Sequence, residues 1–151
     1  MKHALLALFL LGGITFAADD ADSKKLLKNL EGSYKVAAVE KAGDAPPKEF
    51  IESLDKVSIK GNKFSIAFKS GGKAEEKSAT ITVDATKTPA TIDLKADDGE
   101  KRNEVMIGIL QVEGETLKIC WADGPKSARP TKFETNKENK QFMITLTKMK
   151  E

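Results

Sequence analysis

The sequence contains very few of the residue types on which most enzymes and metal sites depend. Its 151 residues include one histidine, His3, and one cysteine, Cys120. We expect His3 to be removed with a leader segment, which leaves no imidazole for a general base or for a typical zinc or copper site. Cys120 then has no histidine to activate it and is expected to pack as a small apolar residue. The acidic stretch from Asp97 to Glu100 lacks the spacing of an EF-hand loop and is typical of a turn. These shortages predict a protein that is not an enzyme and holds no metal or cofactor.

Disulfides and an excess of either charge are also missing. A single cysteine cannot form an internal disulfide, so an exported domain must be stabilised by its core alone. The chain has 25 Lys and Arg against 23 Asp and Glu, and the lysines are interspersed with carboxylates. A surface that binds duplex nucleic acid requires clustered positive charge. A nucleic-acid partner is therefore not expected.

The apolar run from Ala4 to Ile14 stands near the N-terminus, behind the basic residues Lys2 and His3. It is too short to cross a hydrocarbon core of about 30 Å comfortably. The small residues Thr15 and Ala17 that follow it are typical of a signal-peptidase site. We predict a signal peptide at residues 1–17 and an exported product, periplasmic or extracellular, that does not remain in the membrane; a retained anchor is the alternative. Residues 18–151 are enough for one domain.

Alternation of apolar and polar residues dominates the rest of the chain. The clearest hairpin runs from Val105 to Ala122 and turns at Glu113-Gly114-Glu115. Its second arm alternates Leu117, Ile119 and Trp121 with polar or small residues, the period of a strand with one buried face. Similar patterns predict strands at Ser33–Glu40, Lys56–Lys60, Lys63–Lys69, Ser78–Asp84, Ala90–Lys95 and Gln141–Lys148, with a ninth at 132–134 left open. Short turns between consecutive strands favour an all-β fold, an antiparallel up-and-down eight-stranded barrel, with a two-sheet sandwich as the alternative.

Two short helices complete the expected architecture. After a loose segment at residues 19–23, Ser23 is a suitable N-cap for a helix that places Leu26, Leu27 and Leu30 on one side and ends before Gly32. After the first strand, Pro46-Pro47 opens a second amphipathic helix, from Pro47 to Leu54.

The strand at residues 105–112 is apolar on both sides. Val105, Ile107 and Ile109 occupy one side, and Met106, Leu110 and Val112 occupy the other. A strand of this kind needs cover on both faces. We expect the outer cover to be the helix from Pro47 to Leu54 or a second copy of the protein.

Four segments in the same order resemble a lipocalin-like family of small exported bacterial domains, common in planctomycetes and of unknown function. They are Leu30–Val36, Pro89–Leu94, Gly108–Cys120 and Arg129–Phe133. The family often has Trp where this chain has Tyr34, and Tyr where it has Leu110. The resemblance implies that the first helix closes one end of the barrel, that Gly32-Ser33-Tyr34 starts the first strand, and that Arg129 packs over the Tyr34 ring. An ordinary surface position for Arg129 is the alternative.

An eight-stranded barrel is just wide enough to be filled by side chains or to hold one small ligand. The first hypothesis is therefore a non-enzymatic binding module for a small apolar or amphipathic ligand. Its predicted ligand-binding residues are Tyr34, Phe64, Phe68, Ile107, Ile119, Trp121, Arg129 and Phe142. For Trp121, a purely structural place in the core is the alternative. The second hypothesis is a structural or interaction domain that binds a protein partner, or a second copy, through the outer face of the strand at 105–112.

Overall fold

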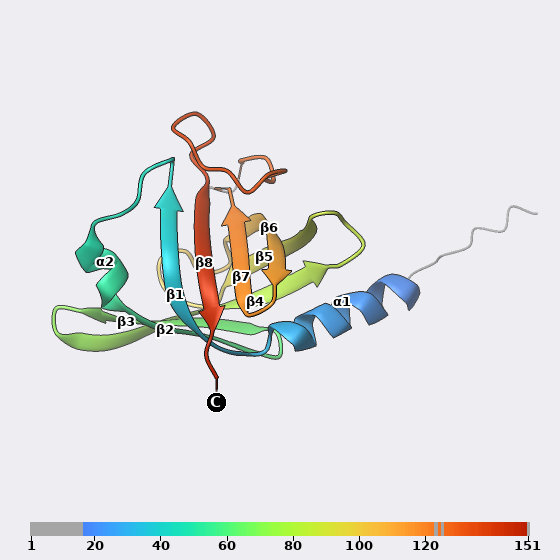
Figure 1. Cartoon of the computed structure of the whole chain (residues 1–151), viewed down its shortest axis with the longest axis horizontal. Helices are drawn as coiled ribbons and strands as arrows, with labels where there is room; N and C mark the ends of the chain where they lie inside the picture. The colour runs from blue at the N-terminus through green and yellow to red at the C-terminus, as the bar shows by residue number, and fades with distance from the viewer. Residues whose placement is uncertain (1–16, 123, 125, 151) are drawn as a thin grey trace, which may run out of the picture.

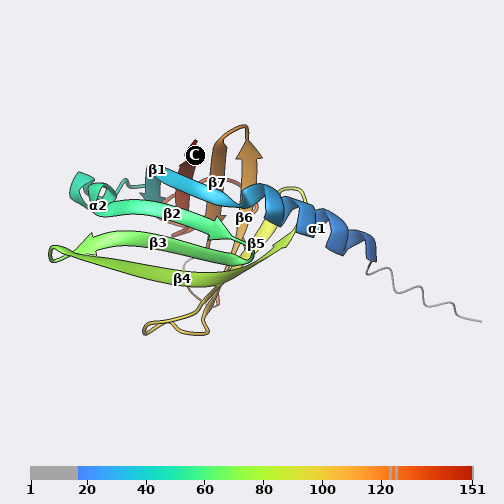
Figure 2. The ribbon, with the colours of Figure 1, turned by 90° about the horizontal axis from the view of Figure 1, so that it is seen from below.

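The computed structural model describes residues 17–122, 124 and 126–150, so the predicted signal peptide lies outside the described residues except for Ala17. Eight antiparallel strands pair in sequence order, and the last strand pairs with the first to close a barrel. Figure 1 shows β7 and β8 crossing β3 and β4 at a steep angle, and Figure 2 shows the same arrangement from below. The closed barrel confirms the predicted all-β up-and-down fold and rules out the sandwich. The elements are α1 (Ala17–Leu30), β1 (Gly32–Lys41), α2 (Lys48–Ser53), β2 (Leu54–Lys60), β3 (Lys63–Ser70), β4 (Lys73–Asp84), β5 (Ala90–Ala96), β6 (Val105–Glu113), β7 (Thr116–Trp121) and β8 (Phe142–Lys148).

Three two-residue hairpin turns begin with a glycine that follows a strand; the one at Gly71-Gly72 joins β3 to β4, with Ser70 opposite Lys73. Gly61-Asn62 joins β2 to β3, with Lys60 opposite Lys63. Gly114-Glu115 joins β6 to β7, with Glu113 opposite Thr116. Gly61 and Gly114 have positive φ, +58° and +60°. Two-residue hairpin turns require such a value, and residues with a side chain disfavour it. The predicted hairpins are confirmed.

Helix α1 is longer than the sequence pattern indicates. It begins at Ala17, so residues 19–23 are helical rather than loose. Ser23 is inside the helix and is not its N-cap; its hydroxyl accepts a hydrogen bond from the Ala85 N–H at 3.2 Å, which ties α1 to the connection after β4. The predicted apolar side is confirmed, because Leu26, Leu27 and Leu30 pack against the core. Figures 1 and 2 show that α1 runs beside β4 and then away from the barrel.

The inward residues of β1 differ from the simple alternation. Tyr34 and Val36 are buried as expected, but Ala38 is exposed and Val39 is buried in its place. The pairing of β1 with β8 shifts between Val36 and Ala38. A β-bulge of this kind adds one residue to one strand and so reverses the faces beyond it. The sequence pattern alone does not reveal the bulge.

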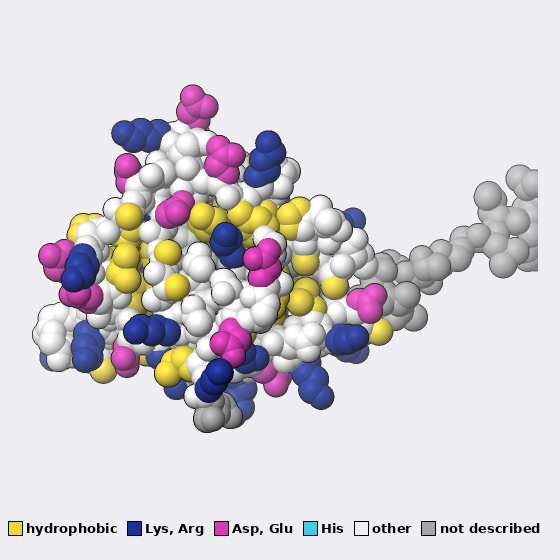
Figure 3. Space-filling model, viewed as in Figure 1, with side chains coloured by type: hydrophobic (Ala, Val, Ile, Leu, Met, Phe, Trp, Pro, Cys, Tyr) yellow, Lys and Arg dark blue, Asp and Glu magenta, His cyan; other side chains and the backbone are white. Residues whose placement is uncertain are grey.

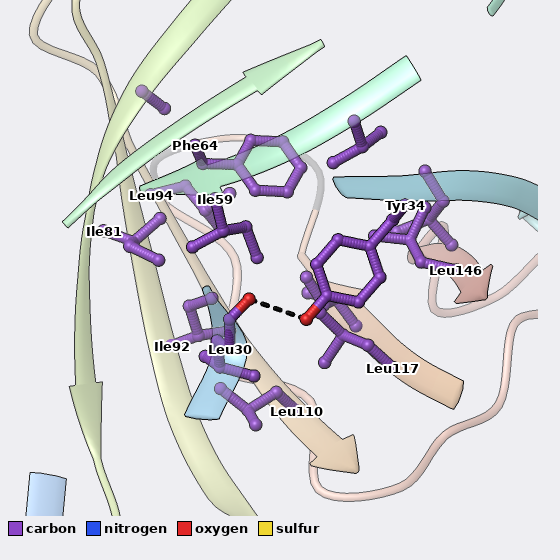
Figure 4. Packing of buried hydrophobic residues seen from close by; sticks show 14 of the residues in the cluster. Leu30, Tyr34, Ile59, Phe64, Ile81, Ile92, Leu94, Leu110, Leu117 and Leu146 are labelled. Carbon is purple, nitrogen blue, oxygen red and sulfur yellow. Dashed lines mark hydrogen bonds between the residues drawn. The ribbon is translucent and has the colours of Figure 1, made fainter. Parts of the chain in front are cut away.

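The end of the barrel beneath α1 is closed and fully packed. Figure 4 shows Leu30 and Tyr34 among apolar side chains from opposite walls, including Ile92, Leu110 and Leu117. The Tyr34 hydroxyl donates a hydrogen bond to the Leu30 carbonyl at 2.6 Å. This bond satisfies one of the carbonyls that a helix leaves free at its C-terminus. The helix therefore closes the barrel with apolar side chains and without an unpaired carbonyl at Leu30.

The cation over the Tyr34 ring is Lys148 and not Arg129. Lys148 lies opposite Tyr34 across the pairing of β1 and β8, with its Nζ 5.8 Å from the ring centroid. The same Nζ donates to the Asn29 carbonyl at 3.2 Å. A Cβ on Gly32 would lie 2.7 Å from Lys148 Cε, so the absence of a side chain at residue 32 leaves space for the lysine side chain. The expectation for Arg129 is wrong because that residue belongs to a segment that covers the other side of the barrel wall.

The outer face of β6, β7 and β8 is covered by the protein's own chain. Ile109, Cys120 and Met143 form a second buried cluster, against which Phe133 packs. Phe133 lies in the segment between β7 and β8, which forms no ninth strand at 132–134. The expectation that α2 covers this face is wrong, because α2 packs against β1, β2 and β3 instead.

Candidate functional site

The end of the barrel opposite α1 contains a pocket of about 560 Å³. Its walls are mostly apolar, and charged residues of both signs lie at its rim. The wall residues are Phe64, Ile66, Ala79, Leu94, Ala96, Met106 and Trp121; the remaining lining residues are Lys77, Ser78, Asp98, Gly99, Glu100 and Lys101. The residues nearest α1, such as Leu110 and Leu117, are fully packed, so only the far half of the barrel is hollow.

The pocket is open because two neighbouring strands part at the mouth. Strand β4 begins at Lys73, earlier than the predicted Ser78, and pairs with β3 from Lys73 to Thr80. Its pairing with β5 starts only at Ala79, opposite Ala96. The first six residues of β4 therefore have no strand on their β5 side, and their charged, exposed side chains hide the strand pattern in the sequence.

The connection between β5 and β6 borders this gap. Its base is fixed to the barrel, since the Asp97 N–H donates to the Ser78 carbonyl at 3.1 Å and Thr80 Oγ1 donates to Asp97 Oδ1 at 2.7 Å. The Asn103 N–H also donates to the Ala96 carbonyl at 2.9 Å. Between these anchors, residues 98–101 border the pocket. The acidic stretch expected to form an ordinary turn is therefore also part of the rim.

An aromatic pair forms one wall. The rings of Trp121 and Phe142 are stacked, with centroids 4.5 Å apart and an interplanar angle of 28°. Gly108 lies opposite Trp121 across the pairing of β6 and β7. A Cβ on Gly108 would lie 2.5 Å from the Cys120 carbonyl oxygen and 3.0 Å from Trp121 Cβ. The absence of a side chain at residue 108 thus allows the two strands to approach at the base of the indole.

The structure brings only some of the predicted ligand-binding residues to the pocket. Phe64 and Trp121 border it, and Phe142 lies behind Trp121. Phe68 lies farther out on β3, where the Lys77 Nζ is 5.8 Å above its ring. Tyr34 and Ile119 are buried in the packed core.

Ile107 and Arg129 lie on the outer side of the barrel wall. Ile92 and Leu94 face the core and pair with Gly108 and Met106, so the residue between these two, Ile107, faces out. It is Met106 that borders the pocket. The inward position predicted for Ile107 is therefore wrong; both sides of β6 are apolar, so the sequence pattern does not indicate which one faces inward. Ile66 and Leu94, which also border the pocket, follow the inward alternation of their strands and were identifiable as inward residues, though not as pocket residues.

Arg129 fastens the outer segment to the wall. Its NH1 donates to the Gly108 carbonyl at 2.8 Å and to the Ile92 carbonyl at 3.4 Å. The same nitrogen lies 2.7 Å from Asp93 Oδ1, in a direction that does not suit a hydrogen bond, so that contact is a charge interaction. The role of Arg129 in the structure is to hold the β7–β8 connection on β5 and β6.

Cys120, the only cysteine of the chain, does not border the pocket. Cys120 is fully buried in the outer cluster, and its thiol contacts Gln141 Oε1 at 3.7 Å. Burial raises the pKa of this thiol, which disfavours the nucleophilic thiolate. In the described part of the chain, no three His, Cys, Asp or Glu side chains are grouped as a metal ion would need.

Comparison of the chain with protein-family models, with curated proteins and with solved structures gives no match. Across residues 17–122, 124 and 126–150, none of the helices has the length and apolar character needed to traverse a bilayer.

Proposed function

We propose that the protein is a binding module that holds one small apolar or amphipathic molecule in the open end of its barrel. The observation that supports this proposal is the apolar pocket of about 560 Å³ beside a fully packed core. Small-molecule sites are commonly concave, mostly apolar and about 300–1,000 Å³ in volume. A ligand would place its apolar part between Phe64 and Trp121 and its polar part at the rim.

We also propose that the protein is related to the lipocalin-like family and that it is exported. A helix that closes one end, the Gly-Ser-Tyr start of β1 and a cation over the tyrosine ring support a lipocalin-like relationship. In this chain the cation comes from Lys148 on the last strand. Export to the periplasm or beyond rests on the signal-like pattern of residues 1–17.

The alternative, a domain that binds a partner through the outer face of β6, has less support. The centre of that face is already occupied, because Ile109 is buried under the connection that carries Phe133. The exposed apolar residues of β6 are Val105 and Val112, which lie at opposite ends of the strand and on opposite sides of it. The face in Figure 3 carries Lys and Arg interspersed with Asp and Glu, without a basic patch. We therefore place function in the pocket.

A fluorescent probe can test the proposal. N-phenyl-1-naphthylamine becomes bright in apolar surroundings, and we expect it to bind the protein with one-to-one stoichiometry. Ala96→Phe would fill the pocket and is expected to weaken binding at least about tenfold, because the ring would take the volume that the probe needs. Ala38→Phe is the matched control, since Ala38 is exposed on the outer side of β1. No binding to the wild type, or equal binding to the Ala96→Phe variant, would contradict the proposal.

A further inference from the structure

The wall formed by Trp121 indicates which kind of molecule the pocket accepts, an inference that rests on the proposed function. Phe142 is stacked on one face of the indole. Trp121 nevertheless borders the pocket and is only partly buried. The part of the indole that Phe142 does not cover, its other face or its edge, is the surface that it can offer to a ligand.

This indole is held in place before any ligand arrives. Its backbone is paired on both sides, with Gly108 of β6 and with Phe142 of β8. At Gly108 the strands approach so closely that a Cβ would meet the Cys120 carbonyl oxygen at 2.5 Å. The stacked Phe142 ring limits rotation of the indole about its own side-chain bonds. An aromatic surface ordered in advance loses little conformational entropy when a ligand binds.

The other lining residues also suit an aromatic ring. Phe64 supplies a second aromatic side chain, and Met106 supplies a thioether, a group that makes favourable contacts with aromatic rings. At the rim, Lys101 is a cation that can lie over an aromatic face. A saturated ligand would gain from burial of apolar area alone, whereas a flat aromatic ligand gains from stacking as well.

We propose that the pocket selects a flat aromatic molecule, which lies against the free face of Trp121. Trp121 is then the residue that determines specificity, and Phe142 and Gly108 are positioning residues that keep its ring in place.

Two compounds with the same carbon skeleton can test this selectivity. Both 2-naphthol and its saturated form, decahydro-2-naphthol, have ten carbons and one hydroxyl, but only the first is flat and aromatic. We expect isothermal titration calorimetry to show that the wild type binds 2-naphthol about fivefold more tightly, the size of effect that one aromatic pair adds beyond buried area. In Trp121→Leu the preference should disappear through loss of 2-naphthol affinity alone.

Two further variants serve as controls. Trp121→Phe keeps an aromatic face and should retain part of the preference; it also serves if the leucine variant does not fold, as checked by thermal unfolding. Phe133→Leu removes an aromatic ring from the outer cluster and should leave the preference unchanged. Equal or tighter binding of the saturated compound to the wild type, or an unchanged preference in the Trp121 variants, would overturn this inference and leave the proposed function standing. Binding of neither compound by the wild type would overturn both.

Discussion

The two ends of the barrel differ in how completely their apolar side chains are covered. Each end has a lysine over an aromatic ring, with the Nζ 5.8 Å from the centroid: Lys148 over Tyr34 at the closed end and Lys77 over Phe68 at the open end. At the closed end, a helix completes the contact, and Leu30 is only 1% exposed. At the open end the short helix α2 packs only against β1, β2 and β3, and Ile66, Met106 and Trp121 remain partly exposed around a pocket.

Under the proposed function, stability and ligand binding are divided between the two ends of the barrel. The closed end buries Leu30, Ile92, Leu110 and Leu117, and its polar groups at Tyr34 and Lys148 are paired. The open end leaves apolar surface in contact with water, which costs free energy in the empty protein and is available to a ligand. Substitutions at the closed end should therefore affect unfolding, and substitutions in the pocket should affect it less.

The largest expected effect is that of Leu30→Ala at the closed end. Because Leu30 is fully buried, we expect its truncation to lower the free energy of unfolding by about 3 kcal/mol through lost burial and a new cavity. Met106→Ala, at the half-exposed pocket wall, should cost about 1 kcal/mol. Urea denaturation of both variants measures the difference. Equal losses would show that the two ends contribute equally to stability.

The next effect is at the base of the pocket wall. Gly108→Ala places a Cβ against the Cys120 carbonyl oxygen and Trp121, and the strands must separate to accept it. We expect a loss of about 2 kcal/mol in urea denaturation and a changed near-ultraviolet circular dichroism signal from the only tryptophan. Gly71→Ala is the comparison, since its Cβ would point into open space and only its φ of +56° is unfavourable, at about 1 kcal/mol. A smaller loss at Gly108 than at Gly71 would refute the close approach of β6 and β7.

Ionisation of Tyr34 should make the free energy of unfolding depend on pH in the alkaline range. It is the only tyrosine, so absorbance of the phenolate reports on it alone. Burial raises its pKa above the ordinary value of 10.0. The unfolded chain then loses this proton at lower pH than the folded protein, so the contribution of Tyr34 is complete below about pH 10 and declines as the pH rises above that value. We expect a titration midpoint above 10.0 in the folded protein.

Tyr34→Phe is the control for that titration. It leaves the Leu30 carbonyl without its donor and should cost about 1.5 kcal/mol at neutral pH. It should also remove part of the loss of stability between about pH 9 and pH 11. A wild-type midpoint at or below the ordinary value would contradict the buried, hydrogen-bonded position of this hydroxyl.

The smallest effects separate the two lysine contacts. Lys148→Met removes a cation from the Tyr34 ring and a donor from the Asn29 carbonyl, and should cost about 1 kcal/mol. Lys77→Met removes only a cation from Phe68, and should cost about 0.5 kcal/mol or less. Urea denaturation at low and high salt is the measurement. If Lys77→Met costs as much as Lys148→Met, the helix C-terminus is not what distinguishes the two contacts.

Sequence reasoning predicted the elements well where the signal is local. The alternation of apolar and polar residues from Lys63 to Lys69 identified β3, and the glycine turns at Gly61 and Gly114 identified two of the tight hairpins. It predicted less of the pocket. Met106 was assigned to one side of β6 without a way to tell which side faces inward, and Ala79 and Ala96 have small side chains that give no sign of a pocket. The bulge in β1 was invisible because it depends on how β8 pairs with β1.

Short-range pattern was thus sufficient to specify most strands and turns and to favour a barrel over a sandwich, since the backbone alternates faces every residue and glycine relieves strain in tight turns. Contacts between distant segments were needed for the rest. They put Lys148 instead of Arg129 on Tyr34, laid Phe133 over the outer face of β6, and left a hollow beside Trp121. These features depend on which surfaces meet when the barrel closes. The periodicity of side chains along one strand does not indicate which distant residues will contact it.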